Sequence, residues 1–292
     1  MLCSLGEFDK AKEYLEKAVS ISKENDDKRE EAGTYNGLAD LSFSEGKNEK
    51  AKEFLEKALA IAAEIGDWKL EGSSYESLAV VCHSLGEYSK AEEYLDKAGT
   101  TGKETGDTKK QTAISYRNKG LFYFSSDEHG RAKEYLEKAL AISKEIGDRQ
   151  GEATDYESLG DVYYHLCEYA KAQEQYEKAL AINKETGDRD KEAADYGELG
   201  KVFHSLGEYC KAKRYYEKEL AIRKEIGDRK GESRSCGELG SVFRSLEEYT
   251  KAKEYYEKAA GIGEETGDKN GVKKYYHLLA VMFYNCLQLL PQ

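Results

Sequence analysis

The stretch that decides the fold runs from Tyr156 to Ile182 and reads YESLGDVYYHLCEYAKAQEQYEKALAI. Its first half places Tyr156, Leu159 and Tyr163 at positions i, i+3 and i+7, which form one face of a helix. Its second half repeats this kind of spacing from Ala172 onward. Two amphipathic helices joined by a short turn are therefore predicted for this stretch.

The same unit recurs along the chain, and a Gly-Asp dipeptide marks its end. The spacing is 40 residues except for one step of 41, at Gly66-Asp67, Gly106-Asp107, Gly147-Asp148, Gly187-Asp188, Gly227-Asp228 and Gly267-Asp268. The glycine suits the left-handed residue that closes a helix, and the aspartate suits the N-cap of the next one. The repetition predicts an all-α fold of about seven helix-turn-helix units and 14 helices in one domain over residues 1–292. The repeat boundaries fall near residues 27, 67, 107, 148, 188, 228 and 268, with half-repeats at both ends.

Composition excludes several classes of function. Asp and Glu number 57 against 45 Lys and Arg, a formal net charge of −12, which argues against binding nucleic acid or an anionic membrane by overall attraction. No apolar run approaches the roughly 20 residues that span a bilayer, and no signal-peptide pattern opens the chain. The 6 cysteines are scattered and favour reduced thiols. We expect a cytoplasmic protein without nucleic-acid or membrane partners.

Nothing in the sequence indicates catalysis. The 5 histidines have no Cys, Asp or Glu at a metal-ligand or triad spacing, and no Gly-rich loop suits a phosphate. We therefore expect no enzymatic activity, no metal site and no cofactor.

One family resembles the repeat. The pattern aromatic-x-x-Leu-Gly-x-x-Tyr over residues 156–163, followed by Ala-x-x-x-Tyr-x-x-Ala over 172–179, resembles the tetratricopeptide repeat, TPR. The 40-residue form, with Leu-Gly-Glu-Tyr and Gly-Asp-Arg, is most similar to the arrays of Pins-type G-protein-signalling modulators. The resemblance implies a right-handed superhelical solenoid whose first helices line a concave groove. It also implies a scaffold or adaptor whose groove holds an extended or helical peptide of a partner protein.

Partner specificity is expected where the repeats differ on the inward positions of the first helices. The candidate groove residues are His83, Arg117, Asn118, Glu157, Asp161, Tyr164, Glu198, Lys201, His204, Arg234, Glu238 and Arg244. The aromatic ones have an alternative role, packing between neighbouring helices. The charges suggest a groove with an acidic N-terminal part and a basic C-terminal part, which would orient a ligand of opposite polarity. Ordinary scatter of surface charge is the alternative.

The junction between residues 98 and 119 departs most from the repeat. Gly99 and Gly102 stand inside an expected helix, where each costs about 0.5–1 kcal/mol relative to alanine. Lys119 takes the place of the usual leucine. These changes predict a weak joint that acts as a hinge or as a docking place, unless one repeat has simply drifted.

The last predicted helix is rich in apolar residues, and this suggests alternatives to a groove-binding scaffold. The candidates for self-association are Leu278, Met282, Phe283, Leu287 and Leu290. Such contacts would pair two C-terminal helices or join copies head to tail. The incomplete ends also fit a fragment of a longer array or a regulatory segment of a larger multidomain protein. The similarity of the repeats fits recent duplication or a designed sequence.

Overall fold

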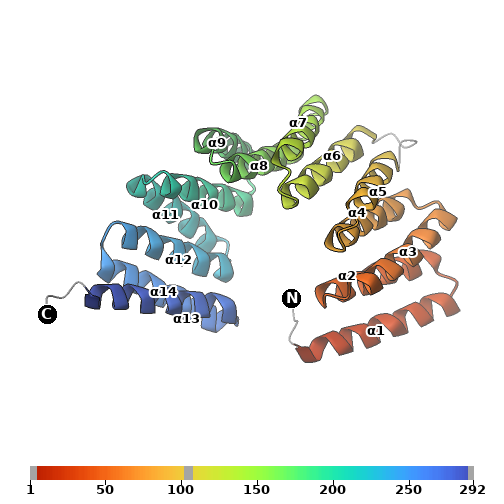
Figure 1. Ribbon diagram of the computed structural model, residues 1–292, viewed down its shortest axis with the longest axis horizontal. Coiled ribbons are helices and arrows are strands. Elements are labelled where there is room, and N and C mark those ends of the chain that lie inside the picture. Colours follow the sequence, from red (N-terminus) through yellow and green to blue (C-terminus); the bar gives the residue numbers. More distant parts are fainter. Residues whose placement is uncertain (1–4, 102–107, 289–292) are drawn as a thin grey trace. The chain divides into compact units, whose positions relative to one another are not determined.

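The computed structural model in Figure 1 describes residues 5–101 and 108–288, with the side chains of residues 5–7, 9, 108 and 283–288 excepted. These ranges contain fourteen α-helices and no strand, so the predicted all-α architecture of helical repeats is confirmed. The helices fall into two compact units, Met1–Asp148 and Arg149–Gln292.

Unit 1 contains the first seven helices. Their bounds are α1 Leu5–Glu24, α2 Lys28–Ser44, α3 Asn48–Ile65, α4 Trp68–Ser84, α5 Tyr88–Thr100, α6 Thr108–Ser125 and α7 His129–Glu145. Within the unit, α2 packs on α3, α4 on α5, and α6 on α7. Each of these pairs is one helix-turn-helix repeat.

Unit 2 contains the other seven helices. Their bounds are α8 Arg149–His165, α9 Tyr169–Thr186, α10 Arg189–Ser205, α11 Tyr209–Glu225, α12 Arg229–Ser245, α13 Tyr249–Thr266 and α14 Lys269–Gln288. The pairs are α8 with α9, α10 with α11, and α12 with α13, while α14 packs on α13 and α12. We call the surface formed by the even-numbered helices of each unit its even-helix face.

The Gly-Asp dipeptide ends one helix and begins the next, as predicted. Gly187 has a φ of 73° in the left-handed region, where a side chain would be strained. The side chain of Asp188 accepts a hydrogen bond from the backbone N–H of Lys191 at 3.2 Å. The dipeptide thereby satisfies backbone groups at both helix ends.

In each two-helix repeat of unit 2, a glycine of the first helix packs against a tyrosine ring of the second helix. A Cβ atom on Gly160 would lie 2.6 Å from the ring of Tyr176, closer than packed atoms approach. Gly200 stands in the same relation to Tyr216 at 2.8 Å. The glycines of the first helices therefore make room for a buried aromatic ring of the second helices.

Candidate functional site

The predicted groove residues all lie on even-numbered helices, and the structure divides them between the two units. Unit 1 holds three of them, His83 on α4 with Arg117 and Asn118 on α6. Unit 2 holds the other nine, on α8 (Glu157, Asp161, Tyr164), α10 (Glu198, Lys201, His204) and α12 (Arg234, Glu238, Arg244). Each even-helix face is therefore a candidate site in its own right.

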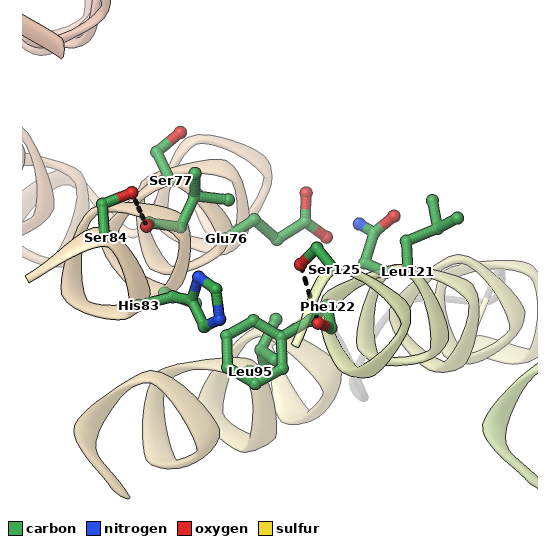
Figure 2. A pocket seen from close by; sticks show the side chains of 11 residues that line it. Glu76, Ser77, His83, Ser84, Leu95, Leu121, Phe122 and Ser125 are labelled. Carbon is green, nitrogen blue, oxygen red and sulfur yellow. Dashed lines mark hydrogen bonds between the residues drawn. The ribbon is translucent and has the colours of Figure 1, made fainter. Parts of the chain in front are cut away.

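In unit 1 a cavity of about 540 Å³ lies between α4 and α6. Figure 2 shows Glu76 and His83 of α4 on one side and Leu121 and Phe122 of α6 on the other, with Leu95 of α5 between them. His83 and Asn118 line this cavity, as does Glu76. Arg117 is not among its lining residues.

The mouth of this cavity is apolar. Val80 of α4 is 50% exposed and Leu121 of α6 is 42% exposed, although both line the cavity. They occupy equivalent positions, one residue after the repeat's small helix-contact residue. The other repeats carry Asp40, Asp161, Lys201, Ser241 and Val281 there. Two exposed apolar side chains beside a hollow form a surface whose burial by a ligand is favourable.

Polar groups flank the apolar mouth. The ring nitrogen Nε2 of His83 lies 2.8 Å from Oγ of Ser126, and the His83 ring meets the Phe122 ring edge-on at 4.8 Å. Burial raises the pKa of Glu76, and a hydrogen bond from Asn118 opposes that rise. The hydrogen bond and the ring contact hold His83 against α6, so the polar rim of the cavity is built from both helices.

In unit 2 the amide of Asn183 on α9 joins two carboxylates of neighbouring even-numbered helices. Its Nδ2 donates to Glu157 at 3.0 Å and to Asp195 at 2.7 Å. Asp195 is 1% exposed, and burial raises its pKa to about 8, with Asn183 opposing the rise and Glu157 adding to it. Glu157 was predicted from the sequence, but Asp195 and Asn183 were not.

Three other predicted residues of this face lie together around Tyr164. Lys201 sits over the Tyr164 ring with Nζ 4.6 Å from its centre, and donates to Glu198 at 3.2 Å. The Tyr164 hydroxyl lies 2.7 Å from Oγ of Ser205. Asp161 is occupied separately, because it accepts a hydrogen bond of 2.6 Å from Tyr176. The predicted aromatic and charged residues are therefore bound to one another as well as lining the face.

A second cavity of about 290 Å³ lies between α10, α11 and α12. It brings together four predicted residues, Glu198, Lys201, Arg234 and Glu238. It is also lined by Glu219 and Arg223 of α11, which the sequence analysis missed because it considered first helices alone. A comparison between repeats would have found them, since Ala179 and Ala259 occupy the position of Glu219 in the neighbouring repeats.

His204 and Arg244 lie outside this second cavity. Nε2 of His204 is 3.3 Å from Oγ of Ser245, which connects α10 to α12. Burial lowers the pKa of His204, Glu238 opposes this effect, and Arg244 adds to it. His204 is therefore favoured in its neutral form by its surroundings.

The predicted weak joint contains a buried cation. Lys119 is 8% exposed and makes an ion pair with Asp96 of α5. A Cβ on Gly99 would lie 2.4 Å from Oγ of Ser115, so this glycine allows α5 to approach α6 closely. Gly102 lies outside the described residues. Lys119 thus replaces apolar burial at this contact with an ion pair.

The residues predicted for self-association are partly committed to the core of unit 2. Met282 is 3% exposed and belongs to the core cluster, and Leu278 packs against that cluster. A buried side chain cannot contact a second copy unless the core opens, so Met282 is not available as a surface residue. The side chains of Phe283 and Leu287, and all of Leu290, lie outside the described residues.

Residues 5–101 and 108–288 contain no group of three or more His, Cys, Asp or Glu side chains arranged to hold a metal ion. Across the same part of the chain, no helix has the length and apolar character needed to cross a membrane.

Comparison with known proteins identifies the repeat. A family model described as tetratricopeptide repeat matches residues 1–64, 30–99, 111–185 and 153–225. A second model with the same description matches residues 233–266. No curated protein matches the chain in sequence.

Several solved structures share the fold. BtubC (BKLC) from P. vanneervenii is 21% identical, with a TM-score of 0.61 over 87% of this chain and 92% of its own. A signal transduction ATPase with numerous domains, which has a tetratricopeptide repeat sensor and comes from Pyrococcus horikoshii, is 24% identical with a TM-score of 0.67. That match covers 87% of this chain and 39% of the ATPase. Aspartyl phosphate phosphatase F from Bacillus subtilis is 13% identical, with a TM-score of 0.61 over 90% of this chain and 73% of its own. At these identities the likeness concerns the fold alone.

Proposed function

Because the chain belongs to the tetratricopeptide-repeat family, we propose that it is a protein-interaction scaffold that binds a peptide or helix of a partner on its even-helix faces. Helical repeats stack into extended surfaces that suit such ligands. The residues that differ between repeats lie on these faces and give them distinct chemistry.

The observation that carries the proposal is the apolar mouth of the cavity between α4 and α6. Val80 and Leu121 remain about half exposed beside a hollow of about 540 Å³. An apolar side chain of the partner would fill the hollow and cover both residues. Burying one side chain of this kind contributes about 1.5–3 kcal/mol, so it would act as an anchor of the interface.

Charge in unit 2 supports a preferred direction for the partner segment. The first even-numbered helix of the unit, α8, presents the carboxyl groups of Glu157 and Asp161, while α12 presents Arg234 and Arg244 against Glu238. A segment with a basic end over α8 and an acidic end over α12 would match these charges. Reversing the charges of Lys201, Arg234 and Arg244 should reduce the affinity of such segments.

The test is a peptide-display selection on the wild-type chain and on the double variant Val80→Asp/Leu121→Asp. Asp is the residue that other repeats carry at this position, as at Asp40 and Asp161, so the variant should fold. We expect wild type to select peptides that share an apolar anchor residue. Their affinity for the double variant should fall about tenfold or more, measured by calorimetry.

The matched control is Ser241→Asp, which places the same charge at the equivalent position of α12. Ser241 accepts a hydrogen bond from Tyr256 at 3.1 Å, and Asp161 accepts the same kind of bond from Tyr176, so the change suits the site. The control should retain the peptides with an apolar anchor. Selected peptides that bind the double variant as well as wild type would contradict the proposed anchor cavity.

The finer features expected from the sequence form part of the same proposal. Closer kinship with the Pins-type signalling arrays is supported by the 40-residue unit. A cytoplasmic, non-catalytic role agrees with the scattered cysteines and with histidines that lack triad or ligand spacing. Self-association through α14 has less support, because Leu278 and Met282 pack into the core of unit 2.

A further inference from the structure

The cavity between α10, α11 and α12 is lined by a buried ion pair that the neighbouring repeats lack. Glu219 and Arg223 are each 6% exposed in their side chains, and both line the cavity of about 290 Å³. The preceding repeat carries Ala179 and Asn183 at these positions. Buried charges are costly, so this substitution calls for a physical explanation.

Only some of the hydrogen-bond donors of the Arg223 guanidinium find an acceptor in the protein. Its terminal nitrogen Nη1 pairs with Asp190 and lies 3.1 Å from Asp228. Its Nε is buried and, among the described residues, finds no hydrogen-bond partner. Nε lies 3.9 Å from a carboxylate oxygen of Glu219, which is beyond hydrogen-bond distance. An N–H donor of a charged group is therefore left unused at the cavity.

Glu219 lies where it can accept from a ligand. Its carboxylate rests against Gly197, where a Cβ would lie 3.0 Å from the carboxylate carbon, so glycine makes room for it. Burial raises the pKa of Glu219 to about 7, while the charges of Arg223 and Arg234 oppose the rise. The proton of Ser235 goes to the carbonyl oxygen of Gly231 at 2.9 Å. The carboxylate thus keeps capacity to accept hydrogen bonds.

The charged side chains that line the cavity balance in number, with Glu198, Glu219 and Glu238 against Lys201, Arg223 and Arg234. Glu198 pairs with Lys201 at 3.2 Å, and Glu238 lies 3.6 Å from Lys274. Arg234 makes no ion pair within the part of the chain described, but its charge acts on both Glu219 and Glu198. A cationic or anionic group entering the cavity would bring an unmatched charge. A neutral group with one donor and one acceptor would not.

We propose that this cavity binds the primary carboxamide of an Asn or Gln side chain from the partner peptide. The amide nitrogen donates to Glu219, and the amide oxygen accepts from Nε of Arg223. The two protein atoms are 3.9 Å apart, which two hydrogen bonds of about 2.9 Å to one amide group can bridge. This inference rests on the proposed peptide-binding function and names a side chain that unit 2 would select.

The first test uses the full chain and the variant Glu219→Ala/Arg223→Asn, which restores the residues of the preceding repeat and should fold. The control is Lys213→Ala/Glu217→Ala, which removes an exposed i,i+4 pair of the same helix at 3.8 Å. Display selections on wild type should yield peptides with Asn or Gln at one constant position. Those peptides should lose affinity at least about tenfold on the first variant and keep it on the control.

Substitutions in a selected peptide test the class of ligand. Replacing its Gln by Glu, Lys or Leu should each weaken binding to wild type, because the first two bring a charge and the third leaves Arg223 Nε and Glu219 unpaired. The inference is overturned if the peptides that depend on Glu219 and Arg223 carry Asp, Glu, Lys or Arg at the constant position. It is also overturned if peptides are selected and none of them depends on these two residues.

A second measurement separates this inference from the proposed function. Propanamide is titrated into wild type while the Nε–H resonance of Arg223, assigned by its loss in Arg223→Asn, is followed by NMR. A saturable shift with propanamide, absent with acetate and absent in Glu219→Ala, is expected. Peptides that depend on Val80 and Leu121, without a propanamide shift, would remove the inference and leave the scaffold. A propanamide shift without any selected peptide would keep the carboxamide site and remove the scaffold function.

Discussion

At the scale of single residues, the repeats differ most in their buried ionisable side chains. Asp195 is 1% exposed and shares the amide of Asn183 with Glu157. What such a group contributes to stability depends on which protonation state the fold favours. Burial raises the pKa of Asp195 to about 8, so the folded chain favours the neutral carboxyl.

The change Asp195→Asn tests this directly. The unfolded carboxyl titrates near pH 4, so between about pH 4 and pH 8 the folded chain holds a proton that the unfolded chain has released. This contribution to stability is complete below pH 4 and is lost as the pH rises through about 8. The free energy of unfolding should fall by up to about 1.4 kcal/mol per pH unit in this window, and Asp195→Asn should remove that slope.

The measurement is urea unfolding of both proteins across this pH range. Glu217→Gln, at a side chain 47% exposed on α11, serves as the matched control and should leave the slope as in wild type. Equal slopes for wild type and Asp195→Asn would show that Asp195 titrates normally in the folded chain.

At the scale of helices, the residues that pack between the two helices of a repeat differ in size from one repeat to the next. In unit 2, Gly200 faces the ring of Tyr216 and Gly240 faces Tyr256. In unit 1, the equivalent positions of one repeat are Ala79 and Leu95, which belong to the same core cluster. In these repeats glycine accompanies the larger aromatic residue and alanine the smaller aliphatic one, because both side chains fill the same space between two helices. The α6–α7 repeat instead pairs Gly120 with Leu136.

The change Gly200→Ala should destabilise unit 2, because the added Cβ would lie 2.8 Å from the buried ring of Tyr216. Overpacking costs about 1–3 kcal/mol, and the better helix propensity of alanine recovers less than about 1 kcal/mol. Adding Tyr216→Leu, which supplies the leucine that accompanies Ala79 in the α4–α5 repeat, should make Gly200→Ala tolerable, so the two changes should be strongly non-additive.

Urea unfolding of the two single variants and the double variant gives the coupling free energy. Gly261→Ala on α13 is the control, since a Cβ there meets nothing within 4 Å and should stabilise the helix by about 0.5–1 kcal/mol. Additive effects of Gly200→Ala and Tyr216→Leu would mean that the two helices adjust their separation freely.

At the scale of the whole molecule, repeats of similar sequence differ in the length of their second helix and in the way that helix ends. The helix α5 has 13 residues and is followed by Thr101 in an extended conformation, whereas α9 has 18 residues and is closed by the left-handed Gly187. Local opening is easier where a helix is short and its end lacks such a cap. This difference agrees with the weak joint expected from the sequence, which stays a prediction.

Hydrogen exchange followed by mass spectrometry checks this expectation. Backbone amides in the last turns of α5, over residues 94–100, should exchange faster than those in the last turns of α9, over residues 180–186. Both segments are the last turns of the second helix of a repeat, so each is the internal control of the other. Exchange as slow in α5 as in α9 would rule out a hinge at this junction.

Much of the candidate site could be predicted from the sequence, because inward positions follow from helical periodicity. The spacing of His83 and Lys201 from the repeat signature was enough to place both on the first helices of their repeats, which are even-numbered helices in the structure. Glu219 and Arg223 were not predicted, because they belong to the second helix of a repeat. Only the packing of α11 against α10 and α12 shows that their side chains reach a cavity of the even-helix face.

The sequence by itself determined the repeat: where the Gly-Asp dipeptides end one helix and begin the next, and how helices pair within a repeat. These features depend on residues a few positions apart, such as Asp188 capping Lys191, and on a period that any single repeat displays. The tertiary structure alone decided which side chains are exposed, which bridge two helices and which lack a hydrogen-bond partner. Val80 and Leu121 line one cavity from α4 and α6, and Glu219 of α11 lies against Gly197 of α10. Their contacts depend on the separation of packed helices, a quantity that no local pattern of residues specifies.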